Sequence, residues 1–474
     1  MTKIKLITPI VMFLLCVQTL NAQKTNEVNT LIGTDAHGHT YPGATSPFGM
    51  IQLSPDTRQD SWDGCSGYHY SDKVIYGFSH THLSGTGCLD YGDILFIPTI
   101  KAWNENDFSM TFEHKNEFAT AGIYKVKNLN KQGIDAYLTT TERVGFHKYV
   151  FPASAKSTSI IIDLLWRDEL LDYDYKILND STVVGYRCSK SWNENQKIFF
   201  ATIFSSKISK HKFDKQTKRL FLEFEPAEEN NKKTIEARTA ISSVNEEGAL
   251  KNLASEESIR FDKALTKNTA LWEKELGKIE IFGGTQKQRD IFYTSLYHCM
   301  IAPNLYSDVD NRYRGMDDKI QNAKDYNRYT VFSLWDTYRT LHPLLSIIDQ
   351  KRSMDFAKTF IDMQLQNGEL PMWELASAET HCMIGMHGIS VLAELYQKGI
   401  YAYPKLTLES MINNANPELR EINKQNYTNK KHNLLGLDYF TKNGYISSEF
   451  EHEGVSKTVE YAYNMYCVAQ VAKS

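Results

Sequence analysis

Hydrophobic residues follow two different periods along the chain, and the change falls near residue 250. From about residue 28 to residue 245, the apolar runs are short, rich in β-branched and aromatic residues, and interrupted by Gly, Asn or Asp at roughly ten-residue intervals. Runs of this kind are typical of β-strands. Since they follow one another without helical segments, we expect an antiparallel β-sandwich over residues 23–250. Expected strands include residues 123–126, 136–139, 144–150, 159–162, 198–204, 220–224 and 237–241.

The second half of the chain has a helical period. Phe261, Leu265, Trp272 and Leu276 recur at helical spacing before Gly277, which predicts a linker helix within residues 251–280. Residues 281–474 are expected to be all-α. The candidate helices cover residues 285–302, 333–349, 353–366, 378–398 and 456–473. The segment 378–398 is apolar around much of its circumference, as an inner helix of a bundle or toroid would be.

Composition excludes two classes of protein. A hydrophobic content of 42% with only 12 Pro excludes a mainly disordered chain. Lys and Arg number 53 against 57 Asp and Glu, without long basic runs, so we expect no nucleic-acid partner. The chain also has 7 Trp, 27 Tyr and 23 Phe. Most of these rings will fill the core, but exposed ones suit the apolar faces of sugars.

The first 22 residues resemble a secretory leader. Lys3 and Lys5 precede an apolar stretch over residues 6–20, and Ala22 offers a cleavage point before Gln23. The stretch is short for a transmembrane span, and no later stretch reaches the length required. We therefore expect export to the periplasm or the medium. A lipid anchor on Cys16 is the less favoured alternative, because small residues do not precede it.

Six cysteines remain after the expected leader: Cys65, Cys88, Cys188, Cys299, Cys382 and Cys467. Their spacing is too wide and irregular for a disulfide scaffold. We expect most of them to be small buried hydrophobic residues, with disulfides as the alternative.

Two segments contain residues that could ligate a metal ion. His80 and His82 would share one face of a strand and could ligate zinc with a carboxylate, but no further ligand has a recognisable spacing, so hydrogen-bonded loop histidines are favoured. The acidic segment 308–318 begins like a calcium loop and then lacks the ligand oxygen, the glycine and the closing Glu of an EF-hand. A solvated acidic turn is expected there.

Carboxylates alternate with tryptophans in two later stretches, which we place at helix starts. Asp336 in the first turn of its helix would be free to bond ligand hydroxyls, and Trp335 and Trp373 could stack on a sugar ring. Glu374 and Glu379 would accept from other hydroxyls. The alternative is that these carboxylates form N-caps and ion pairs between inner helices.

A set of short motifs resembles glycoside hydrolase family 92 in collinear order along nearly the whole chain. The motifs are 29–34 (NTLIGT), 41–44 (YPGA), 47–50 (PFGM), 64–68 (GCSGY), 78–87 (FSHTHLSGTG), 334–337 (LWDT), 371–374 (PMWE) and 382–385 (CMIG). The resemblance implies a multidomain β + α protein with an N-terminal β-sandwich, a linker helix and an (α/α)6 toroid. It also implies calcium-dependent, inverting, exo-acting hydrolysis of α-mannosides, including α-1,2 linkages of N-glycans or mannans, by secreted bacterial enzymes.

The resemblance also implies two carboxylate motifs that this sequence lacks. The family's general acid lies in a His-Met-x-Asn-Glu-Pro motif and its base in a Gly-Asn-Asp motif, and neither string occurs in the 474 residues. Both would fall after Ser474, so residues 281–474 are expected to be an incomplete toroid and the chain a truncated product. Most calcium ligands would be absent as well.

What the resemblance carries over is a candidate rim for binding mannose-containing glycans. Its residues are Gly64, Cys65, Trp335, Asp336, Trp373 and Glu374. The alternative is a catalytically inactive fragment or a weak glycan binder, and a disaccharide phosphorylase of similar architecture is a third interpretation.

Overall fold

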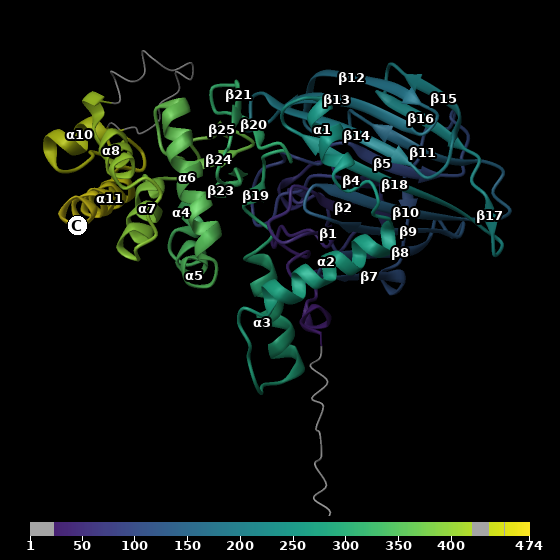
Figure 1. Cartoon of the computed structure of the whole chain (residues 1–474), viewed down its shortest axis with the longest axis horizontal. Helices are drawn as coiled ribbons and strands as arrows, with labels where there is room; N and C mark the ends of the chain where they lie inside the picture. Colours follow the sequence, from purple (N-terminus) through teal and green to yellow (C-terminus); the bar gives the residue numbers. More distant parts are fainter. Residues whose placement is uncertain (1–22, 420–435, 450) are drawn as a thin grey trace, which may run out of the picture.

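The structure, a computed structural model, describes residues 23–419, 436–449 and 451–474. A strand-rich part and a helical part lie side by side, joined below by two helices (Figure 1). The predicted leader lies outside the described residues. Within the described residues, no helix has both the length and the apolar character needed to cross a membrane.

The first sheet of the strand-rich part has seven antiparallel strands. In spatial order they are β1 (Ala44–Thr45), β2 (Gln52–Asp56), β4 (Gly77–Ser79), β5 (Leu95–Thr99), β11 (Thr158–Asp163), β16 (Arg219–Phe224) and β15 (Ile208–Asp214). Alternate residues such as Leu220 and Leu222 on β16 enter the core shared with the second sheet.

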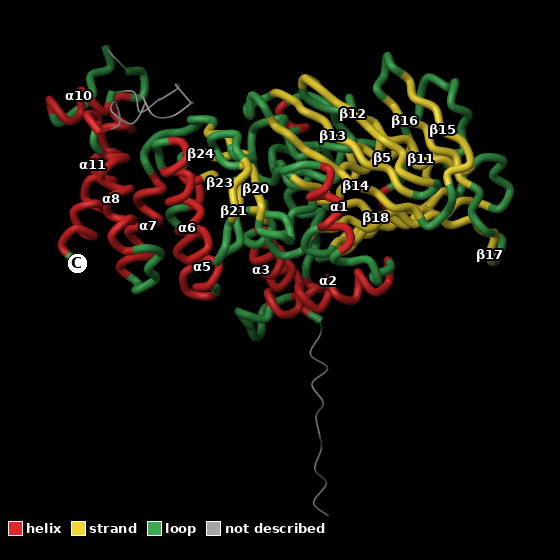
Figure 2. The backbone as a smooth tube through the Cα atoms, turned by 45° about the horizontal axis from the view of Figure 1, so that its top comes forward, coloured by secondary structure: helices red, strands yellow, loops and turns green. Residues whose placement is uncertain are grey.

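The second sheet is also antiparallel and completes the sandwich (Figure 2). Its strands, in spatial order, are β12 (Glu169–Asn179), β13 (Thr182–Lys190), β14 (Gln196–Phe204), β18 (Lys232–Ser242), β10 (Val144–Pro152), β9 (Ile134–Thr140), β8 (Ile123–Leu129) and β7 (Glu117–Thr120), with β17 (Glu228–Glu229) pairing with β18. A small pair, β3 (Val74–Ile75) and β6 (Met110–Thr111), lies apart from both. The predicted β-sandwich is confirmed.

Two helices follow the sandwich. Helix α1 (Glu246–Ala254) begins at Asn245, whose side chain accepts from the Gly248 N–H at 2.8 Å. It packs Ala249 and Leu253 on the outer face of the second sheet. The linker helix is α2 (Phe261–Leu276), in which buried Trp272 donates its indole N–H to the Thr45 carbonyl at 2.8 Å. The helix predicted from Phe261 to Leu276 is thus α2, and α1 is a further helix that precedes it.

The helical part starts with α3 (Gln286–His298), capped reciprocally by Thr285 and Gln288. The further helices described are α4 (Leu334–Thr337), α5 (Leu341–Ile348), α6 (Gln350–Asn367), α7 (His387–Gln397), α8 (Pro404–Ala415), α10 (Leu437–Asn443) and α11 (Gly454–Lys473). Short strands connect some of them: β19 (Asn304–Leu305) with β22 (Tyr329–Thr330), and β20 (Arg312–Arg314) with β21 (Ile320–Asn322). The all-α expectation is wrong in this respect.

The single helix predicted over residues 333–349 is wrong. The segment forms α4 and α5, separated at Thr340, whose backbone angles of φ −135° and ψ −52° are not helical. Pro343 gives the reason, because a proline inside a helix would meet the carbonyl of Arg339, four residues earlier. Restarting the helix at Leu341 places Pro343 in a first turn, where a proline is tolerated.

The helix predicted over residues 378–398 is also wrong in its first half. Residues 378–379 form a strand, and Met383 and Gly385 have positive φ values of 70° and 84°, which no helix accommodates. The helix begins only at His387. The apolar pattern seen in the sequence is correct for α7, in which the seven residues from His387 to Ala393 are all buried and Leu395 is buried beyond Glu394.

The acidic segment 308–318 is not a solvated turn throughout. Asp308 is fully buried and accepts from the Ser242 hydroxyl at 2.7 Å and from the Asn252 amide at 2.8 Å. Burial raises the pKa of the Asp308 carboxyl to about 6. Asp308 therefore connects the helical part to β18 and α1.

Candidate functional site

A small antiparallel sheet lies between the helices and the sandwich (Figures 1 and 2). Its strands are β23 (Phe332–Ser333), β24 (Trp373–Leu375) and β25 (Ala378–Glu379). Trp373 and Glu374 thus lie in a strand, and their placement at a helix start is wrong. Because successive side chains of a strand point to opposite faces, Trp373 and Glu374 face different surroundings.

Trp373 faces the loops of the sandwich. It packs in a buried cluster with Leu83, Cys88 and Tyr91, and its ring meets Trp192 edge-on at a centroid distance of 5.8 Å. Trp373 is 3% exposed, whereas Trp192 is 39% exposed. Trp192 therefore offers at this junction an accessible ring that the sequence reasoning missed.

The strand β24 is fixed to the sandwich by polar contacts as well. The Asn193 side-chain amide donates to the carbonyls of Leu375 and Ala376 at 2.9 and 3.2 Å. Asn193 and Trp192 in turn donate their backbone N–H groups to the carboxylate of Asp90 at 2.9 and 3.1 Å. These hydrogen bonds fix the position of β24 relative to the sandwich.

Glu374 faces inward, and both of its oxygens are engaged by the chain itself. One oxygen accepts from the Thr330 hydroxyl at 2.8 Å and the Ser377 N–H at 2.6 Å, and the other accepts from the Val331 N–H at 3.0 Å. Burial raises the pKa of the Glu374 carboxyl to about 7, against the opposing effect of the buried Arg328 guanidinium. In this arrangement Glu374 shapes the turn that follows β24.

Glu379 has a similar position on β25. Its oxygens accept from the backbone N–H groups of Met372, Trp373 and His381 at 2.8, 2.9 and 2.9 Å. Burial raises the pKa of this carboxyl too. Glu379 therefore clamps the backbone on either side of Trp373.

Trp335 and Asp336 lie in α4, and Asp336 is in its first turn as predicted. Asp336 is exposed and accepts from the hydroxyl of Ser333. Trp335 is half-buried, and its indole N–H has no hydrogen-bond partner within the described residues. Burial raises the pKa of the Cys382 thiol, and the Asp336 carboxylate raises it further, so α4 lies close to the loop after β25.

Gly64 is the last residue of a short 3₁₀ helix of the sandwich (Trp62–Gly64), Cys65 follows it directly, and both are buried. Their carbonyls accept from the buried Arg167 guanidinium at 2.7 and 3.0 Å. Burial raises the pKa of the Cys88 thiol, and the neighbouring Asp90 and Cys65 raise it further. This turn therefore neighbours the loop that packs on Trp373.

The surface of this turn carries a second accessible tryptophan, Trp62, which is 57% exposed. His37 contacts Asp63 at 2.6 Å and lowers the pKa of that carboxyl, and the His39 ring meets the Trp62 ring edge-on at 4.1 Å. The density of Gly, His and aromatic residues over positions 33–70 is the sequence signal for this loop cluster.

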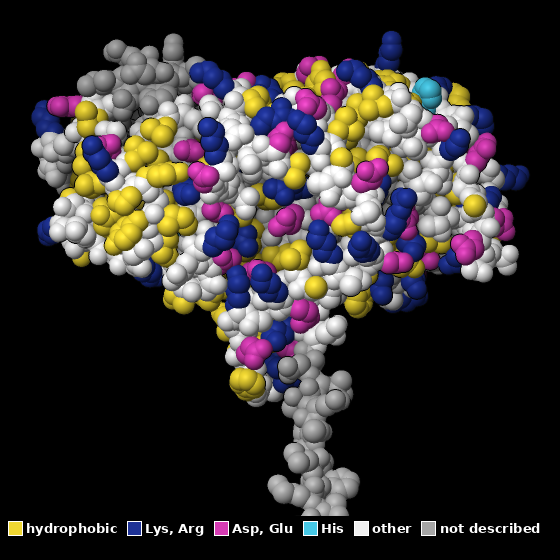
Figure 3. All heavy atoms as spheres, in the orientation of Figure 1, with side chains coloured by type: hydrophobic (Ala, Val, Ile, Leu, Met, Phe, Trp, Pro, Cys, Tyr) yellow, Lys and Arg dark blue, Asp and Glu magenta, His cyan; other side chains and the backbone are white. Residues whose placement is uncertain are grey.

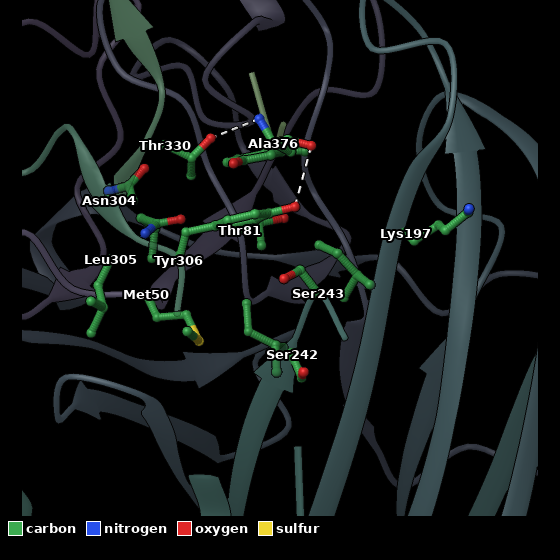
Figure 4. Close-up of a pocket in the computed structure, with 14 residues that line it drawn as sticks. Met50, Thr81, Lys197, Ser242, Ser243, Asn304, Leu305, Tyr306, Thr330 and Ala376 are labelled. Carbon is green, nitrogen blue, oxygen red and sulfur yellow. Dashed lines mark hydrogen bonds between the residues drawn. The ribbon is translucent and has the colours of Figure 1, made fainter. Parts of the chain in front are cut away.

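A small cavity lies where the sandwich meets the helical part, and residues of both parts line it, among them Thr81, Ser242, Tyr306 and Ala376 (Figure 4). It has a volume of about 30 Å³, which is room for a water molecule or two and not for a sugar. Tyr306 donates to the Ala376 carbonyl at 3.3 Å, and the Ala376 N–H donates to Thr330 at 2.8 Å. This cavity belongs to the joint between the two parts of the chain.

The two histidines considered for zinc are buried and hydrogen-bonded. Nδ1 of His80 donates to the Ile94 carbonyl at 2.7 Å, and Nδ1 of His82 lies 2.8 Å from the Gln52 carbonyl. His80 also meets His147 inside the sandwich. The hydrogen-bonded interpretation is confirmed.

The resemblance implies calcium, which requires several oxygen ligands grouped around one point. Over residues 23–419, 436–449 and 451–474, no three His, Cys, Asp or Glu side chains are grouped so that they could hold a metal ion. The buried carboxylates at the junction are directed at backbone N–H groups, as with Glu379. These residues alone do not fit a calcium ion.

The six cysteines after residue 22 are all free. Cys65, Cys88 and Cys467 are buried, and Cys188, Cys299 and Cys382 are partly buried. The expected role as small hydrophobic residues is confirmed for the buried three.

Two family models together match nearly the whole chain. The glycosyl hydrolase family 92 N-terminal domain matches residues 27–245, and the glycosyl hydrolase family 92 catalytic domain matches residues 248–474. The sandwich and the helical domain therefore correspond, in this order, to the two domains of a glycoside hydrolase. The chain belongs to glycosyl hydrolase family 92.

Solved structures show the same fold. The family GH92 alpha-mannosidase BT3965 from Bacteroides thetaiotaomicron is 34% identical, with a TM-score of 0.87 over 95% of this chain and 63% of that one. The family GH92 inverting mannosidase BT2199 from Bacteroides thetaiotaomicron shares the fold at 24% identity, with a TM-score of 0.81 over 96% of this chain and 62% of that one.

Among curated proteins, an "uncharacterized secreted glycosidase" of Arthroderma benhamiae is 23% identical over 94% of this chain and 59% of its own length. The chain thus spans about three fifths of the length of the relatives it matches.

Proposed function

We propose that this chain carries the sugar-binding part of an exo-acting, inverting α-mannosidase. The whole enzyme would remove terminal mannose, including α-1,2-linked mannose, from N-glycans or mannans. The observation that carries the proposal is the likeness to BT3965, which is 34% identical with a TM-score of 0.87 and has been solved in complex with mannoimidazole. Since the chain spans less than two thirds of BT3965, the activity of the whole protein is part of the proposal.

The proposed sugar site is the junction between the sandwich loops and α4. Trp335 supplies a ring for stacking, and Asp336, which is exposed, accepts from sugar hydroxyls. In this proposal the turn at Gly64 and Cys65 would lie on the sandwich side of the sugar. Trp373 and Glu374 are both buried and would position the site from beneath, Trp373 by packing under the sandwich loops and Glu374 by holding the turn after β24.

Inversion requires one protonated carboxyl for the leaving oxygen and one carboxylate for water, roughly 6.5 to 9.5 Å apart. The two motifs that would supply them are not in the 474 residues. We therefore assign the chain's own residues to binding and orientation. Calcium belongs to the proposal for the whole protein, since the residues described here do not complete a site for it.

The second candidate is a catalytically inactive fragment, or a weak glycan binder that assembles with a separately encoded remainder. The absence of the two carboxylate motifs from the sequence favours it. Export to the periplasm or the medium is proposed from the leader-like first 22 residues and from the secreted relative.

Hydrolysis of α-1,2-mannobiose distinguishes these candidates. The purified chain is assayed with calcium, with a chelator, and with added phosphate, alongside a form extended by the two carboxylate motifs. The proposal expects release of mannose by the extended form in calcium and no turnover by the chain alone. Turnover by the chain alone would refute the fragment, phosphate-dependent release would indicate a phosphorylase, and an extended form silent on all α-mannosides would refute the substrate class.

A further inference from the structure

A groove of about 360 Å³ opens on the sandwich far from the junction described above. It lies over β11, β16 and β15, which occupy the end of the molecule away from helices α5 to α11 (Figures 1 and 2). Its volume falls within the range of roughly 300 to 1,000 Å³ typical of small-molecule pockets.

The strand register explains how the floor of the groove forms. On β16, Leu220, Leu222 and Phe224 point into the sandwich, so Phe221 and Glu223 lie on the opposite face and line the groove, where Phe221 is 8% exposed. Across the sheet, Lys212 pairs with Phe221, while Lys210 and Ser159 flank Glu223 on either side. One outward row of side chains therefore combines an aromatic ring, two ammonium groups and a hydroxyl.

The wall of the groove comes from the loop after β5. Phe108 of this loop packs edge-on against Phe221 at 5.3 Å, and Lys101 donates to the Asp107 carbonyl at 2.5 Å. These contacts hold Trp103 over the groove, where the Lys212 ammonium lies 2.8 Å from the centroid of its ring. Trp103 remains 55% exposed, an unusual position for a large apolar ring.

The charge of the groove is positive. Lys101, Lys210 and Lys212 line it together with a single acidic residue, Glu223, whose carboxylate is 3.2 Å from the Lys210 ammonium. Lys212 and Lys101 have no further carboxylate among the lining residues, although Lys101 also lies near Asp107 just outside the groove. The hydroxyls of Ser157 and Ser159, 3.1 Å apart, add neutral polar groups at the same end.

We propose that this groove binds an acidic saccharide, meaning a sugar that carries a carboxylate or a phosphate. Its apolar face would lie on the Trp103 and Phe221 rings, its hydroxyls would meet Ser157 and Ser159, and its anion would pair with Lys101 and Lys212. A neutral sugar would leave the two ammonium groups uncompensated. The site is independent of the proposed mannosidase function, because it shares no residue with the junction.

Titration calorimetry on the full chain tests the proposal with four probes: a glucuronate-containing disaccharide, mannose 6-phosphate, inorganic phosphate and mannose. The two acidic saccharides are expected to bind saturably and to weaken as salt is added. The double variant Lys101→Gln with Lys212→Gln should weaken them at least about tenfold, and Trp103→Ala by a similar factor. Lys127→Gln, an exposed lysine on β8, is the matched control and should leave binding unchanged.

The remaining outcomes overturn the proposal. If mannose bound as tightly as the acidic saccharides, the lysines would not select for negative charge. If inorganic phosphate bound as tightly, the aromatic rings would contribute nothing to affinity. Acidic saccharide binding that survives both the lysine variant and Trp103→Ala would place the ligand elsewhere. Absence of saturable binding by either acidic saccharide would refute the site directly. Thermal unfolding of each variant checks that it is folded.

Discussion

At the scale of single residues, the most constrained polar group of the sandwich is a buried histidine pair. Because Nδ1 of His80 donates to a carbonyl, its Nε2 accepts from Nε2 of His147 at 2.9 Å. Nδ1 of His147 then accepts from the Tyr149 hydroxyl at 2.8 Å. Each imidazole therefore has one donor nitrogen and one acceptor nitrogen, and protonation of either acceptor nitrogen would break this series of hydrogen bonds.

This chain of hydrogen bonds predicts acid sensitivity. Burial lowers the pKa of His80 to about 4 and that of His147 well below its ordinary value. Between about pH 6.5 and pH 4, the unfolded chain therefore binds more protons at these positions than the folded chain does, and stability falls as pH falls. From pH 7 to pH 5, His80 alone should cost about 2 kcal/mol in the free energy of unfolding.

Urea unfolding at pH 7 and pH 5 measures this loss. A His80→Asn and His147→Gln variant, less stable at pH 7, should lose markedly less between the two pH values, while His211→Gln at the exposed edge strand serves as the control. An unchanged loss in the double variant would contradict the assignment.

The carboxylates of the junction show why the sequence could not resolve their roles. Glu374, Glu379 and Asp336 read alike as sugar ligands, yet Glu374 and Glu379 each accept three hydrogen bonds from the chain, while Asp336 is exposed. The three carboxylates differ because Glu374 and Glu379 belong to the small sheet, whose strands β23 and β24 are far apart in sequence.

At the scale of secondary-structure elements, hydrophobic periodicity predicted the strands and helices whose positions are determined by local sequence. The strands at β10, β11 and β14 and the helices α3, α6 and α11 lie where the pattern placed them. The pattern failed at Pro343 and at Glu379, where backbone sterics or a buried carboxylate overrode it. The tryptophan Trp192 was missed because its position beside Trp373 depends on tertiary contacts.

Helix α1 gives a prediction at this scale. Gly248→Ala would ordinarily favour a helix by up to about 1 kcal/mol. Here the new Cβ would lie 2.2 Å from an Asp308 oxygen and 2.5 Å from the Ser242 hydroxyl. We therefore expect a destabilisation of about 1–3 kcal/mol in urea unfolding. Glu247→Ala, the exposed neighbour, should change stability by less than about 0.5 kcal/mol, and a stabilised Gly248→Ala would contradict the packing.

At the scale of the whole molecule, the two parts of the chain are joined through Asn193. Asn193→Ala removes both hydrogen bonds to the turn after β24. If the junction is the sugar site, mannose affinity should fall several-fold although Asn193 lies behind the proposed rim. Asn195→Ala is the nearby control and should leave mannose affinity unchanged. Equal mannose affinity of Asn193→Ala and the unmodified chain would show that the junction does not position the sugar site.

The helical part exposes apolar surface over α11 (Figure 3). On α11, Val455, Val459 and Tyr466 are 80%, 63% and 59% exposed, while Tyr461 and Cys467 are buried on another face. Exposed apolar surface of this extent promotes association. We expect concentration-dependent self-association in analytical ultracentrifugation, reduced by Val459→Lys with Tyr466→Lys. The Val309→Lys control, at an exposed residue beside α1, should associate as before. A monomer at all concentrations would contradict the expectation.

The central claim is that a sugar is held between the sandwich loops and α4, and mannoimidazole binding to this chain tests it most directly. Calorimetry should show saturable binding that Trp335→Ala and Asp336→Asn each weaken by about tenfold or more, while Trp103→Ala leaves it unchanged. Binding that is equally strong in all three variants would contradict the claim.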